Sequence, residues 1–266
     1  MQTLKISFIG GGNMAEALIA GLLSSNHEPQ NILVSEPRPQ RRLELSDQYG
    51  IRTTADNNEA ALGTDILVLA VKPQQMRDAV RSIAGHLGEQ ATVVSIAAGV
   101  RTASLAEWLD DAAHIVRVMP NTPALVGAGM SVLFSKAGGT YCQRAEYVLK
   151  SCGEVAWVDH EDQLHAVTAV SGSGPAYFFL LAEMMQAAGV SLGLPKALAE
   201  KLATQTALGA GRMLCESGRS AEALRHQVTS PGGTTQAALD VMYEMGLPDA
   251  VRKGVVAASK RSAELG

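Results

Sequence analysis

The sequence predicts an α/β protein: an N-terminal Rossmann-type, mostly parallel sheet with helices on both faces, followed by an all-helical C-terminal domain. Short apolar runs alternate with helix-length segments in the first part of the chain. These runs lack the polar alternation of half-exposed strands, as expected when helices cover both faces of a sheet. The pattern changes near residues 155–159, and beyond them we find only helical periodicity. We therefore predict two domains, at residues 1–159 and 160–266.

Six apolar runs are the predicted strands of the first domain: residues 5–9, 32–35, 66–71, 92–96, 115–118 and 130–134. The predicted helices are at residues 13–24, 41–48, 74–86, 102–109 and 140–150. Two helix starts fit a capping box, in which the first and fourth side chains bond each other's backbone N–H groups. These starts are Asp56 with Glu59, and Thr140 with Gln143.

The second domain has the 3.6-residue periodicity of helices throughout. The predicted elements are a long helix from residue 162, interrupted or kinked around residues 172–175, and helices at 195–215, 221–228, 234–245 and 248–264. Pro195 and Pro248 fit the first turn of a helix, where proline is tolerated. The many Ala and Leu residues indicate helix faces too apolar for one protomer. We therefore expect a homodimer built through this half.

Composition narrows the class of partner. The chain has 266 residues, 47% hydrophobic and 18% charged, with a net charge of −4. No basic run interleaves with aromatic residues, so the electrostatic footprint of a nucleic-acid-binding protein is absent and a small-molecule partner fits better. The three cysteines, Cys142, Cys152 and Cys215, have neither metal-type spacing nor an even count, which argues against a disulfide framework and for a reducing compartment.

The chain start also bears on location. Its first ten residues, MQTLKISFIG, are too short and too quickly interrupted for a signal peptide. The longest uninterrupted apolar stretch, residues 177–182, is too short to span a bilayer. We therefore expect a cytoplasmic protein that does not enter a membrane.

A glycine-rich turn follows the first predicted strand and opens a helix. Gly10, Gly12 and Ala15 fit G-x-G-x-x-A, with Asn13 and Met14 inside the motif. Gly10 permits the tight turn, Gly12 lets backbone approach a pyrophosphate, and Ala15 lets helix and strand pack closely. The phosphates would lie at the helix N-terminus. The alternative is a turn that binds nothing, but the strand before it and the helix after it favour dinucleotide binding.

The end of the second strand bears on which dinucleotide binds. Glu36 stands where an acid would bind the ribose hydroxyls of NAD, whereas Ser35 and Arg38 are placed to hold the extra phosphate of NADP. Since Pro37 restricts the backbone of Glu36 and can turn its carboxylate away, we favour NADPH, with NADH as the alternative. Two further arginines, Arg41 and Arg42, fit either this role or a solvated helix face.

Other strand ends meet the same edge of the predicted sheet, where open α/β sheets place their ligands. The cofactor-binding residues predicted there are Val71, Lys72, Pro73, Ala97, Ala98, Gly99, Met119, Pro120 and Asn121. We also assign Asn58 to this set. The alternative for each segment alone is a rigid turn that only ends a strand.

These segments together resemble the pyrroline-5-carboxylate reductases, and the resemblance spans essentially the whole chain. The matching segments are residues 8–15, 70–73, 97–100, 119–123, 171–177 and 228–235. The last two, SGSGPAY and VTSPGGTT, carry the most specificity, because Rossmann features are shared by many dehydrogenases. The family varies at residues 35–37, so its pattern leaves the cofactor preference open there.

The resemblance implies hydride transfer from NAD(P)H to the cyclic imine 1-pyrroline-5-carboxylate, giving L-proline in the last step of proline synthesis. It implies a homodimer unit that can build a larger homo-oligomer such as a decamer. The implied substrate-binding residues are Ser230, Gly232, Gly233, Thr234 and Thr235. Thr235, by resemblance, is the catalytic residue and hydrogen-bonds the ring nitrogen.

The chemistry of the loop suits an anionic imine. Backbone N–H groups of Gly232 and Gly233 ahead of a helix can form a nest for a carboxylate, and Ser230 and Thr234 can add hydroxyl contacts. A protonated imine is already electrophilic, so the enzyme needs orientation more than a strong acid. The alternative is a helix cap whose glycines serve geometry only.

Other polar residues of the chain receive no role in the reaction. For Ser173 and Tyr177 we expect close helix packing. None of the six histidines belongs to a nucleophile or metal arrangement, so no metal is expected.

Two other functions compete with this one. A hydroxyacid dehydrogenase of similar architecture would use a lysine of the first long helix as acid and base, yet residues 161–191 contain no Lys or Arg. A regulatory protein that senses nicotinamide without turnover is the other alternative, and the loop at residues 229–235 argues against it.

Overall fold

The computed structural model describes residues 1, 3–110 and 113–266. Its contacts divide the chain into two compact units. The first is Met1–Gly172 together with Ala258–Gly266, and the second is Ser173–Ala257. The boundary that the sequence predicts between residues 159 and 160 stays a prediction; by contacts, residues up to Gly172 and the last nine belong with the sheet.

The first unit is built on one eight-stranded sheet of order β3-β2-β1-β4-β5-β6-β7-β8. The strands are β1 Ile6–Ile9, β2 Ile32–Ser35, β3 Arg52–Thr54, β4 Ile66–Leu69, β5 Thr92–Ser95, β6 His114–Met119, β7 Gly129–Ser135 and β8 Gly153–Trp157. Every neighbouring pair is parallel except β6 and β7. The predicted mostly parallel Rossmann-type sheet is therefore confirmed.

The sequence analysis missed two strands, β3 and β8, at the two edges of the sheet. β3 has only three residues and no buried one, and β8 has only exposed and half-buried positions. An edge strand needs no continuous apolar run, because it has a neighbour on one side only. The six central runs were found because helices bury both of their faces.

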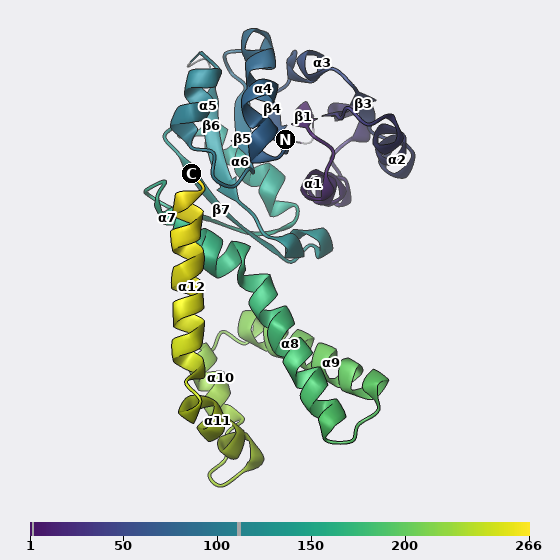
Figure 1. The fold of residues 1–266 in the computed structure, drawn as a ribbon. Coiled ribbons are helices and arrows are strands. Elements are labelled where there is room, and N and C mark those ends of the chain that lie inside the picture. The colour runs from purple at the N-terminus through teal and green to yellow at the C-terminus, as the bar shows by residue number, and fades with distance from the viewer. Residues whose placement is uncertain (2, 111–112) are drawn as a thin grey trace. The chain divides into compact units, whose positions relative to one another are not determined.

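Helices cover both faces of this sheet (Figure 1). Their bounds are α1 Asn13–Ser24, α2 Pro39–Tyr49, α3 Asn57–Ala61, α4 Pro73–Ile83, α5 Thr102–Trp108, α6 Thr140–Lys150 and α7 Gln163–Val167, with 3₁₀ turns at Pro29–Asn31, Ala84–His86 and Thr122–Val126. One buried cluster joins α1, α2 and α6 to the sheet, and a second joins α3, α4 and α5 to its other face. A π-helical turn, Thr168–Gly172, follows α7, at the predicted interruption.

The two predicted capping boxes are only partly formed. Asp56 precedes α3, and its carboxylate accepts the backbone N–H of Asn58 at 2.9 Å. The Glu59 carboxylate instead accepts the hydroxyl of Thr54 at 2.6 Å, so the reciprocal half is missing. For α6 the prediction is wrong, because Gly139 is the capping residue and no side-chain cap is present.

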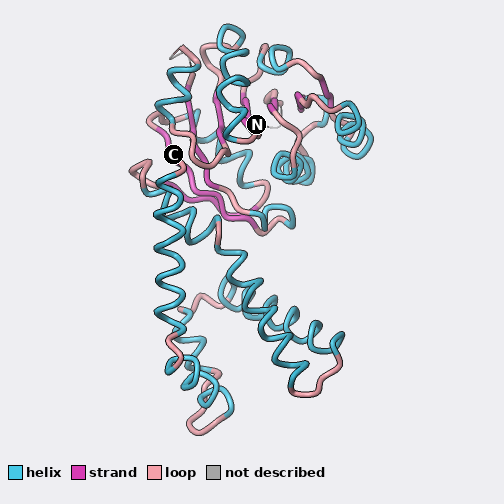
Figure 2. Tube along the Cα trace, viewed as in Figure 1, coloured by secondary structure: helices cyan, strands magenta, loops and turns pink. Residues whose placement is uncertain are grey.

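The second unit consists of helices and loops, and residues 173–257 are all described (Figure 2). Its helices are α8 Gly174–Ser191, α9 Lys196–Glu216, α10 Ala221–Gln227, α11 Thr234–Glu244 and α12 Leu247–Glu264, the last of which ends in the first unit. Pro195 caps α9, and Pro248 is the second residue of α12. The predicted all-helical second half is confirmed.

The helices of the second unit bury few of their large side chains. Phe178 and Phe179 on α8 are 65% and 69% exposed. The helical run Gln163–Ser191 is, by length and composition, long and apolar enough to cross a membrane, and only 17% of its window is buried. The expectation that no segment can span a bilayer depended on the uninterrupted run at residues 177–182, which ends at Glu183; the helix around it still reaches a mean hydropathy of 1.2 over 18 residues. A single helix of this kind is weak evidence for a membrane span, since core helices of soluble proteins share its composition.

Candidate functional site

The predicted cofactor residues come together at one edge of the sheet. β2, β1, β4, β5 and β6 are consecutive and parallel, so their carboxyl ends lie side by side. β1 lies between β2 and β4, and the chain order reverses there. Open α/β sheets bind ligands in the crevice at such a reversal. The residues assigned to the cofactor lie at the carboxyl ends of these five strands, in the loops that follow them or in the first turn of the next helix, except Asn58, which is in α3 after β3.

The glycine turn after β1 has one packed and one open member. Gly10 has φ +99°, its N–H donates to the Ser35 carbonyl at 2.8 Å, and a Cβ there would lie 2.8 Å from the Ala70 carbonyl oxygen. At Gly12 a Cβ would meet nothing within 4 Å. Gly12 directly precedes α1, whose first N–H groups have no partner within the helix. The turn is thus fixed on the sheet side and open on the side where a pyrophosphate would lie.

Three residues at the start of α1 complete this motif. Ala15 is fully buried, which supports its predicted role in close packing of helix and strand. Asn13 is exposed and Met14 is half-buried. All three lie where the sequence motif places them.

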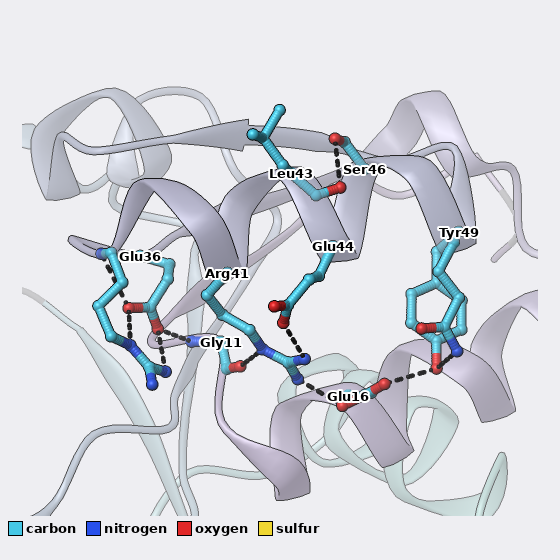
Figure 3. A network of polar contacts seen from close by, with 10 residues as sticks. Gly11, Glu16, Glu36, Arg41, Leu43, Glu44, Ser46 and Tyr49 are labelled. Carbon is cyan, nitrogen blue, oxygen red and sulfur yellow. Dashed lines mark hydrogen bonds and ion pairs between the residues drawn. The ribbon is translucent and has the colours of Figure 1, made fainter.

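Glu36 is buried and already has its hydrogen-bond partners (Figure 3). Its carboxylate accepts the Gly11 N–H at 3.1 Å, the Arg38 N–H at 3.1 Å and the Arg38 Nε at 2.8 Å. Burial opposes ionisation of Glu36, but these donors outweigh it and hold the pKa of the carboxyl below its usual value. The sequence predicted only that this carboxylate turns away from the cofactor ribose. The structure shows that it faces the glycine turn instead.

Ser35 and Arg38, the predicted phosphate ligands, differ in accessibility. Ser35 is buried, and its hydroxyl donates to the Asn57 side-chain oxygen at 2.7 Å. The Arg38 side chain is 67% exposed and forms an ion pair with Glu36. The guanidinium of Arg38 can therefore still take a phosphate, whereas the hydroxyl of Ser35 already has a partner inside the protein.

Asn58 provides an independent sign of a ligand. Its backbone N–H donates to Asp56, but its side-chain oxygen is buried and has no hydrogen-bond partner among the residues that the structure describes. A buried acceptor without a donor is costly unless a ligand or water satisfies it. A dinucleotide carries ribose hydroxyl and adenine amino donors. The open Gly12 and this unsatisfied oxygen both fit a bound dinucleotide.

The ends of β4 and β5 present a lysine and a second packed glycine. Lys72 is exposed and precedes α4, which starts at Pro73 after the half-buried Val71. Ala97 is buried and Ala98 is exposed. Gly99 has φ +77°, and a Cβ there would lie 2.7 Å from the Leu265 carbonyl oxygen. The end of the chain therefore lies against the loop after β5, which the sequence analysis did not foresee.

The end of β6 is tied to the π-helical turn. The Asn121 side chain donates to the Ser171 carbonyl at 3.2 Å and to its hydroxyl at 3.3 Å, and accepts the Met130 N–H at 2.9 Å. The Asn121 side chain is therefore engaged inside the protein, and its predicted contact with the cofactor stays a prediction. Pro120 is buried, and a Cβ on Gly172 would overlap the terminal methyl of Met119, so the Met119 side chain packs directly against Gly172.

An ion pair between the buried Arg117 and the half-buried Glu161, which was not predicted from the sequence, supports the same edge. Arg117 of β6 bonds Glu161 at 2.8 Å, and that carboxylate also accepts the N–H and hydroxyl of Thr102, the first residue of α5. Burial raises the pKa of Glu161, but Arg117 and Thr102 outweigh it, so the net pKa is lowered. No motif indicates this pairing, because the residues are 44 and 59 positions apart.

The predicted substrate loop lies in the second unit, between α10 and α11. Gly232 has φ +70° and is open, and Gly233 directly precedes α11. The Gly233 N–H donates to the Ser230 carbonyl at 3.0 Å, so it is not free for a ligand as the sequence analysis expected. The first N–H groups of α11 remain available by the geometry of helix starts. Thr234 is exposed and Thr235 is half-buried on this first turn.

No group of three or more His, Cys, Asp or Glu residues in the described part of the chain is arranged to hold a metal ion. Backbone N–H groups, hydroxyls and a few cationic side chains are the polar groups that the residues of both candidate sites offer.

Comparisons with known proteins agree with this arrangement. Residues 161–265 match the family model described as pyrroline-5-carboxylate reductase dimerisation, and residues 5–99 match the model described as NADP oxidoreductase, coenzyme F420-dependent. A pyrroline-5-carboxylate reductase of Pseudomonas aeruginosa is 44% identical over 100% of this chain and 98% of its own length.

Solved structures give the same result. A pyrroline-5-carboxylate reductase from Coxiella burnetii has a TM-score of 0.95 and 42% identity, covering 99% of both chains. A pyrroline carboxylate reductase from Plasmodium falciparum, solved with NADP bound, has a TM-score of 0.87 and 30% identity, covering 100% of this chain and 99% of its own. The resemblance of the sequence motifs is confirmed, and the hydroxyacid dehydrogenase alternative is not favoured. The chain belongs to the pyrroline-5-carboxylate reductase family.

Proposed function

We propose that this chain reduces 1-pyrroline-5-carboxylate to L-proline with NADPH, the last step of proline synthesis, in the cytoplasm. The observation that carries the proposal is the match to reductases of this name over the full chain, at 44% identity in one case. The geometry supports it, because an open glycine turn at a sheet edge and a glycine-containing loop at a helix start suit a dinucleotide and an anionic ring.

The residues proposed to hold the cofactor are the predicted set at the sheet edge. They are Gly10, Gly12, Asn13, Met14, Ala15, Ser35, Arg38, Asn58, Val71, Lys72, Pro73, Ala97, Ala98, Gly99, Met119, Pro120 and Asn121. NADPH is preferred over NADH because the Glu36 carboxylate is occupied by Gly11 and Arg38, while the Arg38 side chain is exposed. When bound, the reduced nicotinamide supplies the hydride.

The substrate residues are proposed to act by position. Ser230, Gly232, Gly233 and Thr234 form the turn, and the N–H groups at the start of α11 face the substrate carboxylate. Thr235 accepts the N–H of the protonated imine and orients the ring. The hydride adds to the imine carbon, the C=N electron pair moves to nitrogen, and nitrogen keeps the proton it already carries, so no strong acid is required.

We also propose that the second unit forms a homodimer, which can assemble further, for example into a decamer. Phe178, Phe179 and other large apolar side chains of α8 are exposed, which an interface of this kind would bury. For the division of labour we keep the predicted bounds as a proposal, with residues 1–159 binding the dinucleotide and residues 160–266 binding the substrate and forming the dimer. A monomer by light scattering at micromolar concentration would contradict the assembly.

A cofactor-consumption assay tests the reaction. We expect oxidation of NADPH with pyrroline-5-carboxylate and no reduction of NADP⁺ with a 3-hydroxy acid. Thr235→Ala should lower kcat by about tenfold, the value of one hydrogen bond, with folding and cofactor binding intact. An inactive wild-type enzyme would overturn the function, and unchanged turnover in Thr235→Ala would remove Thr235 from the mechanism.

A further inference from the structure

Two oppositely charged side chains hold the peptide groups on the two sides of Gly11, the middle residue of the glycine turn. On one side, Gly11 donates its N–H to the Glu36 carboxylate at 3.1 Å; on the other, its carbonyl accepts from Arg41 Nε at 2.8 Å (Figure 3). Gly11 is buried, and these contacts come from the β2–α2 connection and the first turn of α2. The orientation of both peptide planes is therefore set by side chains outside the turn.

Arg41 is fully engaged inside the protein. Besides Gly11, its guanidinium bonds Glu44 at 3.2 Å and pairs with the Glu16 carboxylate, which also accepts the Tyr49 hydroxyl at 3.0 Å (Figure 3). Arg41 is only 17% exposed, whereas Arg38 is 67% exposed. The hydrogen bond from Arg41 is the main influence that lowers the pKa of Glu16, so this pair is ionised at neutral pH.

An apolar contact from the same helix face limits the turn further. Leu45 follows Arg41 by one helical turn and is fully buried. A Cβ on Gly11 would lie 2.8 Å from Leu45 Cδ1. The polar contact from Arg41 and the packing of Leu45 therefore restrict Gly11 together.

We propose that Arg41 is a positioning residue of the cofactor site: through Gly11 it sets the direction in which Gly12 faces the pyrophosphate, and it does not read the extra phosphate of NADPH. The pyrophosphate is common to NADPH and NADH, so loss of Arg41 weakens both equally. This inference rests on the proposed use of a nicotinamide dinucleotide.

The test compares binding of the two cofactors to four variants of the full chain. Dissociation constants for NADPH and NADH are measured by fluorescence titration of wild type, Arg41→Met, Arg41→Lys, Arg38→Met and Arg52→Met. Arg52 is a matched control, because it is an exposed arginine of the same unit with a surface partner, Glu59.

We expect Arg41→Met to raise both dissociation constants by about tenfold, leaving their ratio unchanged and kcat at saturating cofactor within about twofold of wild type. Arg41→Lys should recover part of the affinity, since an ammonium can reach Gly11 or Glu16 but cannot present the planar fork. Arg38→Met should weaken the binding of NADPH but not of NADH. Arg52→Met should leave the binding of both cofactors unchanged.

Other outcomes overturn the proposal. A loss confined to NADPH in Arg41→Met would make Arg41 a phosphate reader, and affinities within twofold of wild type would remove its positioning role. If Arg41→Met does not fold, Glu16→Gln gives the same measurement, because it removes the charge that holds the guanidinium; unchanged affinities there would count against the proposal. Failure of the wild type to bind either cofactor would overturn the proposed function instead.

Discussion

The two units of this chain differ in where their apolar side chains lie. In the first unit, Phe8 of β1 is 0% exposed and belongs to a cluster that α1, α2 and α6 cover. In the second unit, Phe178 of α8 is 65% exposed. Large exposed patches of apolar side chains mark interaction surfaces in soluble proteins. The comparison teaches that one chain completes the core of the sheet unit, whereas the helical unit needs a partner to bury its apolar faces.

The largest expected effect is loss of core packing in the first unit. Phe8→Ala should lower the free energy of unfolding by about 3–5 kcal/mol, because it removes a fully buried ring and leaves a cavity. Urea denaturation followed by circular dichroism measures the change. Phe178→Ala is the matched control and should change the unfolding of the isolated protomer by no more than about 0.5 kcal/mol. Equal losses in both variants would remove the contrast between the units.

The next effect separates the two glycines of the turn after β1. Gly10→Ala should destabilise the fold by about 1–3 kcal/mol, because Gly10 has φ +99° and no room beside Ala70. Gly12→Ala should leave the melting temperature nearly unchanged and weaken NADPH binding, because its open face is where the pyrophosphate is proposed to lie. Thermal melting with and without NADPH measures both. A stability loss in Gly12→Ala as large as in Gly10→Ala would argue that Gly12 is structural.

A charge introduced on the exposed face of α8 tests whether the apolar side chains of the second unit form the dimer interface. Phe178→Asp should raise the dimer dissociation constant by about tenfold or more, since a buried Phe contributes roughly 1.5–3 kcal/mol. Sedimentation velocity over a dilution series measures it. Leu43→Asp is the control: Leu43 is exposed on α2 and points away from the Arg41 contacts (Figure 3). An unchanged dissociation constant for Phe178→Asp would place the interface elsewhere.

The smallest effect concerns pH. His27 is buried beside Tyr147, and burial lowers its pKa. Folded His27 therefore binds a proton less readily than His27 of the unfolded chain. Neutral His27 thus stabilises the fold fully above the ordinary histidine pKa of about 6.5, and this stabilisation is lost as pH falls below that value. We expect the melting temperature to fall between pH 7.5 and 5.5, and less so in His27→Gln. His226→Gln, on an exposed histidine of the second unit, should keep the wild-type slope.

Much of the first unit could be predicted from local sequence. The six central strands were found because burial on both faces requires continuous apolar runs, and the glycine turn was found because strand, glycines and helix are contiguous. The edge strands β3 and β8 could not be found this way, since their exposed residues carry no periodic signal. The loop at residues 230–235 was recognised as a motif, but the bond from the Gly233 N–H to Ser230 depends on turn geometry.

The sequence alone determined the fold class and the family resemblance and proposed the residues of both candidate sites, because each depends on short segments whose spacing encodes their geometry. Only the tertiary structure decided which polar groups are already engaged. Glu36 faces Gly11 and Asn121 faces Ser171, while the Asn58 side-chain oxygen has no partner in the described part of the chain. The physical reason is that a hydrogen bond depends on distances of about 3 Å between groups far apart in the chain, which residue order does not specify.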